Sequence, residues 1–122
     1  MKSTIKASTD ISFIFAHGKR FSTPFFTVLV LKQQSQHDPR GRVAVIAGKK
    51  SGNAVWRNAA KRRMRALIAE YDGPWDGLDV IFLAKASILK VPYSKVSNAC
   101  AKAVSKAGLS SPRPFGEDRE SN

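Results

Sequence analysis

Apolar residues recur at helical spacing in three segments of the chain. The first segment begins near residue 10 and stops at Gly18. The second starts after Asn53, a good N-cap, and continues to Tyr71, where Asp-Gly-Pro follows as a stop signal. The third opens at Pro92 and ends at Gly108. The pattern therefore predicts three amphipathic helices, of which the middle one is the longest.

Between these helices lie short runs of aliphatic, aromatic and β-branched residues, which are typical of strands. Residues 25–31 and 42–47 form two such runs, and the polar turn between them predicts that they pair as a hairpin. The run at 78–84 is apolar apart from Asp79 at its mouth, which predicts a strand in the centre of the sheet. A further strand at 19–22 is only weakly indicated.

The length and composition predict one domain with one core, over residues 1–109. Residues 110–122 are rich in Pro, Ser and mixed charge, which predicts a disordered tail. Cys100 is the only cysteine, so the chain can form no intramolecular disulfide and no cysteine zinc site. No apolar stretch is long enough to span a bilayer, and no secretory signal is visible. We therefore expect a cytoplasmic protein that makes no use of a membrane.

The formal net charge is +12, and the charge is concentrated in residues 49–65. This run holds seven cationic side chains, and no acidic residue occurs between Asp38 and Glu70. Such a run favours an anionic partner, of which nucleic acid is the commonest for a small basic domain. A membrane surface, an acidic protein or a face that serves only solubility are the alternatives.

Helical geometry separates the cations of this run from its apolar residues. One sector of about 140° holds Arg57, Asn58, Lys61, Arg62 and Arg65, and another holds Ala60, Met64, Leu67 and Tyr71. One face of the helix should therefore pack on the sheet while the other presents cations to phosphates, which the planar arginine fork binds well. Lys49, Lys50 and Asn53 lie beside the helix N-terminus, where backbone N–H groups add to the attraction of anions.

The run Lys-Lys-Ser-Gly-Asn-Ala-Val-Trp-Arg-Asn-Ala-Ala-Lys-Arg-Arg-Met-Arg at 49–65 closely resembles the hallmark of the bacterial ribonuclease P protein family. The resemblance extends over roughly residues 4 to 108. It implies an α+β sandwich of order α-β-β-β-α-β-α around a mixed sheet. It also implies that the basic helix joins two parallel strands through a left-handed crossover, against the usual preference.

The resemblance further implies a role in 5′ maturation of precursor tRNA. A large RNA subunit would hold the Mg²⁺ ions and carry out hydrolysis, and the protein would bind that RNA as a monomer in a 1:1 ribonucleoprotein. The implied RNA contacts are Lys49, Lys50, Asn53, Arg57, Asn58, Lys61, Arg62 and Arg65. The implied cleft for the single-stranded 5′ leader is lined by Ile11, Phe15 and Leu29. The family often has aromatic residues at the positions of Ile11 and Leu29, and core packing is the alternative role for Phe15.

Other functions find less support in the sequence. Catalysis by the polypeptide would need clustered carboxylates or a histidine pair, but the aspartates are scattered, and His17 and His37 occupy a helix end and a turn. We therefore expect no catalytic residue, no metal site and no cofactor belonging to the protein itself. A structural RNA-binding protein of ribosomal type remains the alternative function, because it would need the same charge.

Overall fold

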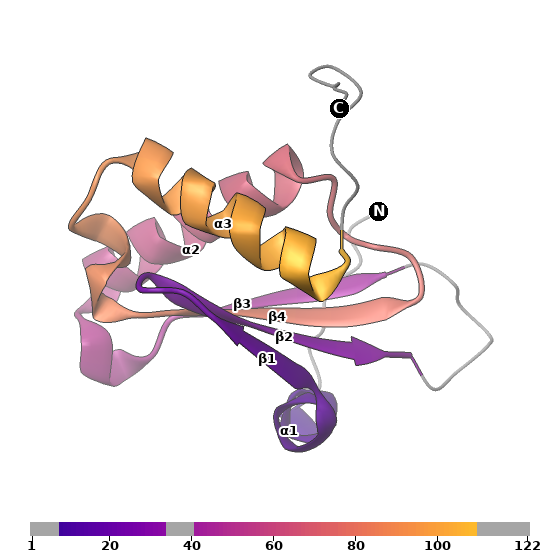
Figure 1. The fold of residues 1–122 in the computed structure, drawn as a ribbon. Helices are drawn as coiled ribbons and strands as arrows, with labels where there is room; N and C mark the ends of the chain where they lie inside the picture. Colours follow the sequence, from indigo (N-terminus) through magenta and orange to yellow (C-terminus); the bar gives the residue numbers. More distant parts are fainter. Residues whose placement is uncertain (1–7, 34–40, 110–122) are drawn as a thin grey trace, which may run out of the picture.

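The computed structural model describes residues 8–33 and 41–109, and the predicted tail at 110–122 lies outside them. The elements follow in the predicted order (Figure 1): α1 (Ser8–His17), β1 (Lys19–Ser22), β2 (Phe26–Lys32), β3 (Arg42–Ile46), α2 (Ala54–Glu70), β4 (Leu78–Ala84) and α3 (Tyr93–Ala107). Two short 3₁₀ helices, η1 (Lys49–Ser51) and η2 (Ala86–Leu89), precede α2 and α3. The weakly indicated strand at 19–22 is confirmed.

The four strands form one mixed sheet in the order β1-β2-β4-β3. β4 is antiparallel to β2 and parallel to β3, so its predicted central position is confirmed. The predicted hairpin between 25–31 and 42–47 is wrong, because β4 lies between those two strands. Val80, Ile81 and Phe82 of β4 have no exposed surface. A strand that is apolar on both faces is best placed with a neighbour on each side, and this burial outweighs the local turn signal between β2 and β3.

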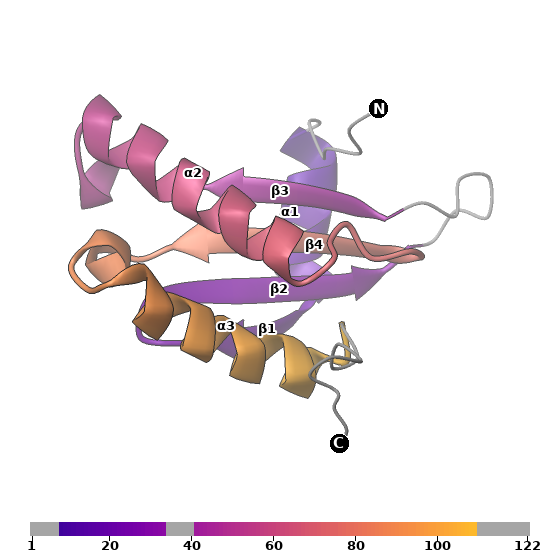
Figure 2. The same cartoon turned by 90° about the horizontal axis from the view of Figure 1, so that it is seen from above.

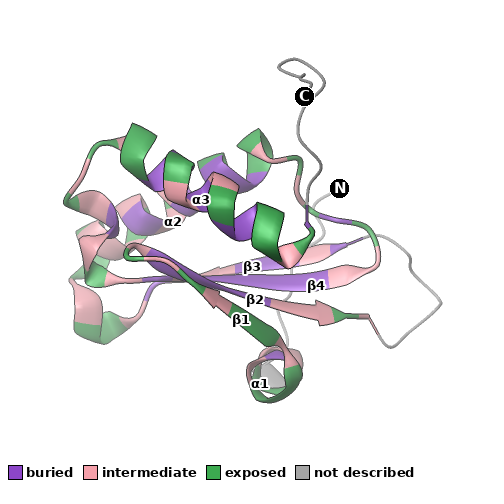
Figure 3. Cartoon of the chain, in the orientation of Figure 1, coloured by how far each residue is buried: buried purple, intermediate pink, exposed green. Residues whose placement is uncertain are grey.

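Helices cover both faces of the sheet (Figures 1 and 2). α2 and α3 lie on one face, where their apolar residues pack against Phe26, Val28 and Phe82 in the main core. α1 lies on the other face, over a smaller cluster of Ile14, Leu29, Ala44 and Ile81. Alternate residues of β2 and β4 thus serve opposite faces, as the pleat of a strand requires. In Figure 3 the buried positions of α2 and α3 face the sheet and the exposed ones face outward.

The chain passes from β3 through α2 to β4, and these two strands run in the same direction. Seen from the side of α2, in Figure 2, this crossover is left-handed. The usual crossover has the opposite hand, because right-twisted strands favour it. The result agrees with the expectation from the family resemblance.

Local signals fixed the ends of the helices. The Asn53 side chain accepts a hydrogen bond from the backbone N–H of Trp56 at 2.9 Å, which caps α2 as predicted. Gly108 ends α3 in the left-handed conformation at φ 68°, a region that glycine adopts without strain. Among the described residues, no helix is both long enough and apolar enough to cross a membrane.

Candidate nucleic-acid interface

The inner face of α2 fixes the direction of its cations. Ala60, Met64 and Leu67 have no exposed surface, and Ile68 is also buried, so the predicted apolar sector packs on the sheet. Tyr71, assigned to the same sector, is half-buried and donates a hydrogen bond to the Ser97 carbonyl of α3 at 3.0 Å. Burial of these side chains holds the helix in one rotation about its axis, and the opposite sector must face outward.

That outward sector, called the α2 ridge below, consists of Arg57, Asn58, Lys61, Arg62 and Arg65. Asn58, Arg62 and Arg65 are exposed, and Arg57 and Lys61 are half-buried. Arg57 also donates a hydrogen bond from Nη1 to the Gly52 carbonyl at 3.3 Å. Within the described part of the chain, no carboxylate forms an ion pair with a residue of the ridge. The ridge therefore presents a positive field that its own neighbours do not neutralise.

The segment before α2 adds to this surface. Lys49 and Lys50 are exposed on η1, immediately before the helix N-terminus. Trp56 packs closely over Gly52, where a Cβ atom would lie 2.7 Å from the indole ring. Only glycine permits this approach, which positions η1 against the first turn of α2. Asn53 accepts the capping hydrogen bond with its side-chain oxygen, which leaves both N–H groups of its amide nitrogen to meet a ligand.

Arg63 differs from its neighbours on α2. Its Nη1 atom donates to the carbonyls of Ile88 at 3.0 Å and Val91 at 2.8 Å, and its guanidinium lies 5.7 Å from the centre of the Tyr93 ring. The residue therefore joins α2 to the segment that leads into α3. Nothing in the sequence distinguishes this arginine from those of the ridge except its place on the helical wheel.

The sheet face beneath α1 is only partly covered. Half-buried apolar side chains surround the small core there: Ile11, Phe15, Leu31, Ile46 and Leu83. Ile11 and Phe15, two of the three residues expected in the leader cleft, thus retain exposed surface. Leu29, the third, has no exposed surface and offers a ligand no contact. Ile46 and Leu83 are paired across β3 and β4, and no local pattern in the sequence indicates their place here because strand pairing brings them together.

An arginine and two carboxylates join α1 to the sheet. Arg42 of β3 contacts Asp79 of β4 at 2.7 Å and Asp10 of α1 at 3.1 Å. Hydrogen bonding to Asp79, aided by Asp10, raises the pKa of Arg42 above its usual range, and partial burial opposes this rise. In the sequence, Asp79 stands only as the polar residue at the mouth of the strand predicted at 78–84. Its 5% exposure shows that it is a buried charge with a dedicated partner.

The described residues contain no group of three or more side chains suited to hold a metal ion. Cys100 is fully buried, and burial raises the pKa of its thiol to about 12, so the reactive thiolate is disfavoured near neutral pH. What the surface offers instead is a ridge of cations on one face of the sheet and a partly exposed apolar surface beside α1 on the other. These features define a small basic α+β protein with the surface of a polyanion-binding module.

Comparison with known proteins identifies the family. A family model described as ribonuclease P matches residues 1–108. A ribonuclease P protein component of Syntrophomonas wolfei is 31% identical over 109 residues, covering 88% of this chain and 89% of the relative. One from Streptococcus agalactiae is 29% identical over 111 residues, covering 89% of this chain and 99% of the relative. The chain belongs to the ribonuclease P protein family, whose members are protein components of a tRNA-processing ribonucleoprotein.

Solved structures agree on the fold. A Staphylococcus aureus RNase P protein superposes with a TM-score of 0.77 at 22% identity, covering 91% of this chain and 100% of the other. The RNase P protein from Thermotoga maritima gives a TM-score of 0.71 at 22% identity, covering 86% of this chain and 97% of the other. The α+β sandwich predicted from the sequence is thus shared with proteins of the same family.

Proposed function

We propose that the α2 ridge, with Lys49 and Lys50, binds the RNA subunit of ribonuclease P through its phosphates. The observation that carries this proposal is the uncompensated charge of the ridge on a helix whose rotation is fixed by burial. Arginine and lysine on successive helical turns suit a polyanion better than a single small ligand. Asn53 and Asn58 add amide groups that can hydrogen-bond to the same RNA.

In this proposal the partly exposed apolar surface beside α1 forms a groove that binds the unpaired 5′ leader of precursor tRNA. Phe15 offers an aromatic ring for base stacking, and Ile11, Ile46 and Leu83 offer apolar contact. Leu29 supports the groove from within the core and makes no contact of its own. Fewer exposed rings than the family often has would leave more of the leader affinity to charge.

The chemical step, in this proposal, belongs to the RNA subunit, which holds most of the required Mg²⁺. The protein contributes affinity and placement of substrate at physiological salt as a cytoplasmic monomer in a 1:1 complex. No observation on the described residues favours the alternative of a ribosomal structural protein.

Reconstitution tests the proposal directly. The purified chain is added to a cognate catalytic RNA at low magnesium, with precursor tRNA cleavage as the readout. We expect strong stimulation by the natural chain, and a large loss with Lys61→Ala/Arg65→Ala. The affinity of this variant for the RNA should also depend less on salt, by about one phosphate for each lost cation. Lys90→Ala, which removes an exposed lysine outside the ridge, is the matched control.

Absence of stimulation by the natural chain would refute the proposed function. Stimulation that the double variant retains in full, with an unchanged salt dependence, would show that the ridge is not the RNA contact.

A further inference from the structure

A pocket of about 650 Å³ lies between β1, the turn that follows it and α3. Its charged lining residues are Arg20, Lys95, Lys102 and Lys106, its uncharged polar ones are Ser22, Thr23 and Asn98, and no acidic residue lines it. Figure 2 shows that α3 lies over β1, which is an edge strand of the sheet. The pocket is lined by these two elements and therefore lies at that edge. It is therefore separate from both surfaces described above.

The lysines of the pocket lie on one side of α3. Lys95, Lys102 and Lys106 are spaced by seven and four residues, which is helical spacing, and all three are exposed. Among the residues that the structure describes, none of the three forms an ion pair. A group of like charges that has no carboxylate beside it attracts anions.

Aromatic surface lies beside these cations. Phe21 and Phe25, both half-buried, line the pocket together with Pro24, and the exposed Asn98 supplies an amide. Cations that follow a backbone, combined with rings on which bases stack, are the usual features of sites for unpaired nucleic acid. A small phosphate ligand would make no use of the rings, so an RNA strand fits the pocket better.

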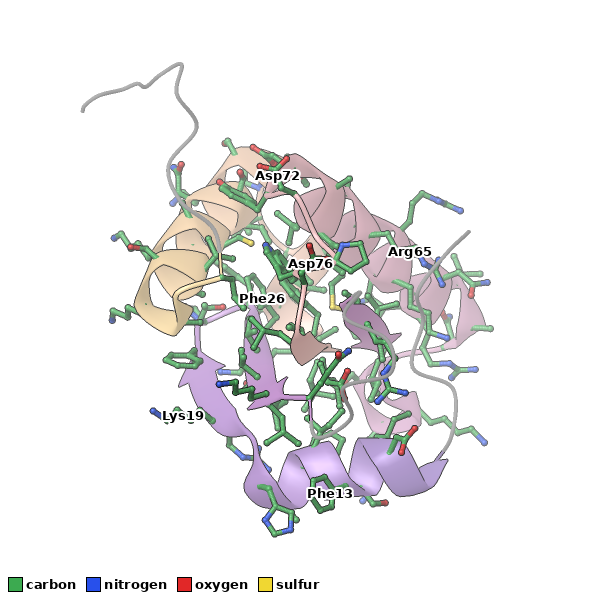
Figure 4. The ribbon with its side chains drawn as sticks, turned by 90° about the vertical axis from the view of Figure 1, so that its right-hand side faces the viewer. Phe13, Lys19, Phe26, Arg65, Asp72 and Asp76 are labelled. Atoms are coloured by element: carbon green, nitrogen blue, oxygen red, sulfur yellow. The ribbon has the colours of Figure 1, made fainter. Side chains whose placement is uncertain are left out.

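The pocket and the α2 ridge face different parts of a partner. α2 lies over the β3 side of the sheet and α3 over the β1 side (Figure 2). Arg65 of the ridge and Lys19 of β1 accordingly lie on opposite sides of the molecule in Figure 4. The RNA segment that contacts the ridge is thus different from the one that can enter the pocket.

Arg20 connects the pocket to the groove beside α1. Its guanidinium lies 5.7 Å from the centre of the Phe15 ring, and the same residue lines the pocket. β1 is an edge strand, so an unpaired chain can pass around it from one face of the sheet to the other. An RNA chain that follows this path passes Arg20 and then meets the lysines of α3.

We propose that the pocket binds unpaired RNA and receives the upstream part of a long 5′ leader after it leaves the groove beside α1. The identity of the RNA as leader rests on the proposed function above. Binding of unpaired RNA by the pocket does not rest on the proposed function, because it is argued from the lysines, the aromatic rings and the Asn98 amide that line the pocket.

Titration of the isotope-labelled full chain with a uridylate hexamer tests the pocket itself. We expect the backbone amide signals of Phe25, Asn98 and Lys102 to shift at saturation. Lys102→Gln/Lys106→Gln should abolish the shifts of Phe25 and Asn98 and leave the ridge signals unchanged, whereas Lys90→Gln should change neither. Pocket signals that stay in place while those of the ridge move would overturn the proposal, and the spectrum also reports whether each variant is folded.

Leader length identifies the source of the RNA. In the reconstituted holoenzyme, Lys102→Gln/Lys106→Gln should raise KM by about threefold to tenfold for a leader of about 12 nucleotides, and have no effect with about 3 nucleotides. An equal loss with both leaders would assign the pocket to the RNA subunit and overturn the leader assignment. No loss with either leader would also overturn the leader assignment. If the natural chain fails to stimulate the catalytic RNA, the proposed function fails, while the uridylate titration still decides whether the pocket binds unpaired RNA.

Discussion

Arg42 and Asp79 are register partners on the parallel strands β3 and β4, and they are joined by two hydrogen bonds. Nε of Arg42 donates to Oδ1 of Asp79 at 2.9 Å, and Nη2 donates to Oδ2 at 2.7 Å. The remaining Nη1 donates to Asp10 at the start of α1. One guanidinium thus connects the edge strand, the central strand and the helix that borders the groove.

Replacing Arg42 with leucine leaves the buried carboxylate of Asp79 without its principal partner. We expect Arg42→Leu to lower the free energy of unfolding by about 2 kcal/mol, because unpaired buried charge is costly, and the partly exposed site moderates the loss. Asp79→Asn should cost less, since the amide oxygen still accepts a hydrogen bond. Urea denaturation measures both. A loss below about 0.5 kcal/mol for Arg42→Leu, the range of ordinary surface substitutions, would contradict this account.

Arg62 and Arg63 are neighbours in sequence with opposite expected roles. Arg63→Ala removes two hydrogen bonds to carbonyls and should lower the free energy of unfolding by about 1–3 kcal/mol, with little change in the salt dependence of RNA binding. Arg62→Ala should leave stability unchanged and reduce that salt dependence by about one phosphate. Thermal unfolding and RNA titration at several salt concentrations measure the pair. The same outcome for both variants would mean that the contacts of Arg63 do not separate its role from that of the ridge.

Phe15 and Phe13 form a matched pair on α1. Phe15 is half-buried beside the groove, whereas Phe13 is 45% exposed, points away from the sheet and packs on His17 (Figure 4). Phe15→Ala should weaken binding of precursor with a 5′ leader by about 1–3 kcal/mol, the usual value for a base stacked on a ring. It should have little effect on substrate without a leader, and Phe13→Ala should change neither. Equal weakening of both substrates by Phe15→Ala would return Phe15 to a purely structural role.

Burial of Cys100 makes the free energy of unfolding fall at alkaline pH. Burial raises the pKa of the folded thiol from its ordinary value of 9.0 to about 12, so the unfolded chain loses this proton first as the pH rises. The stabilisation is complete below pH 9 and is lost between pH 9 and 12, and by pH 10.5 the loss should reach about 2 kcal/mol. Burial also raises the pKa values of Tyr71 and Tyr93, which adds to the decline in the same direction.

Urea denaturation at pH 8 and 10.5 measures this effect. Cys100→Ala should lower stability at both values through the lost side-chain volume, but should show a smaller drop between them, because only the tyrosine contributions remain. An identical drop in the natural chain and the variant would contradict the assignment to Cys100.

The order of the elements could be predicted from the sequence because local rules set it. The cap at Asn53, the stop at Gly108 and the period of apolar residues in α2 act over a few residues, and each appears in the structure as expected. The same period placed the cations of the ridge on the outer face of α2. The RNA contacts assigned to them stay predictions, since they depend on a partner.

The pairing of strands and the contacts across elements were decided only by the tertiary structure. A turn signal between β2 and β3 indicated a hairpin, but β4 takes the place between them because its two apolar faces are buried there. Arg42 meets Asp79, and Arg63 meets the Val91 carbonyl, across separations of 37 and 28 residues that no local pattern encodes. The sequence by itself thus determined the helices, the strands and the cationic face, because these follow from neighbours along the chain. Folding alone decided which strands pair, which face of the sheet stays open and which cations are left for a ligand, because burial is shared among distant segments.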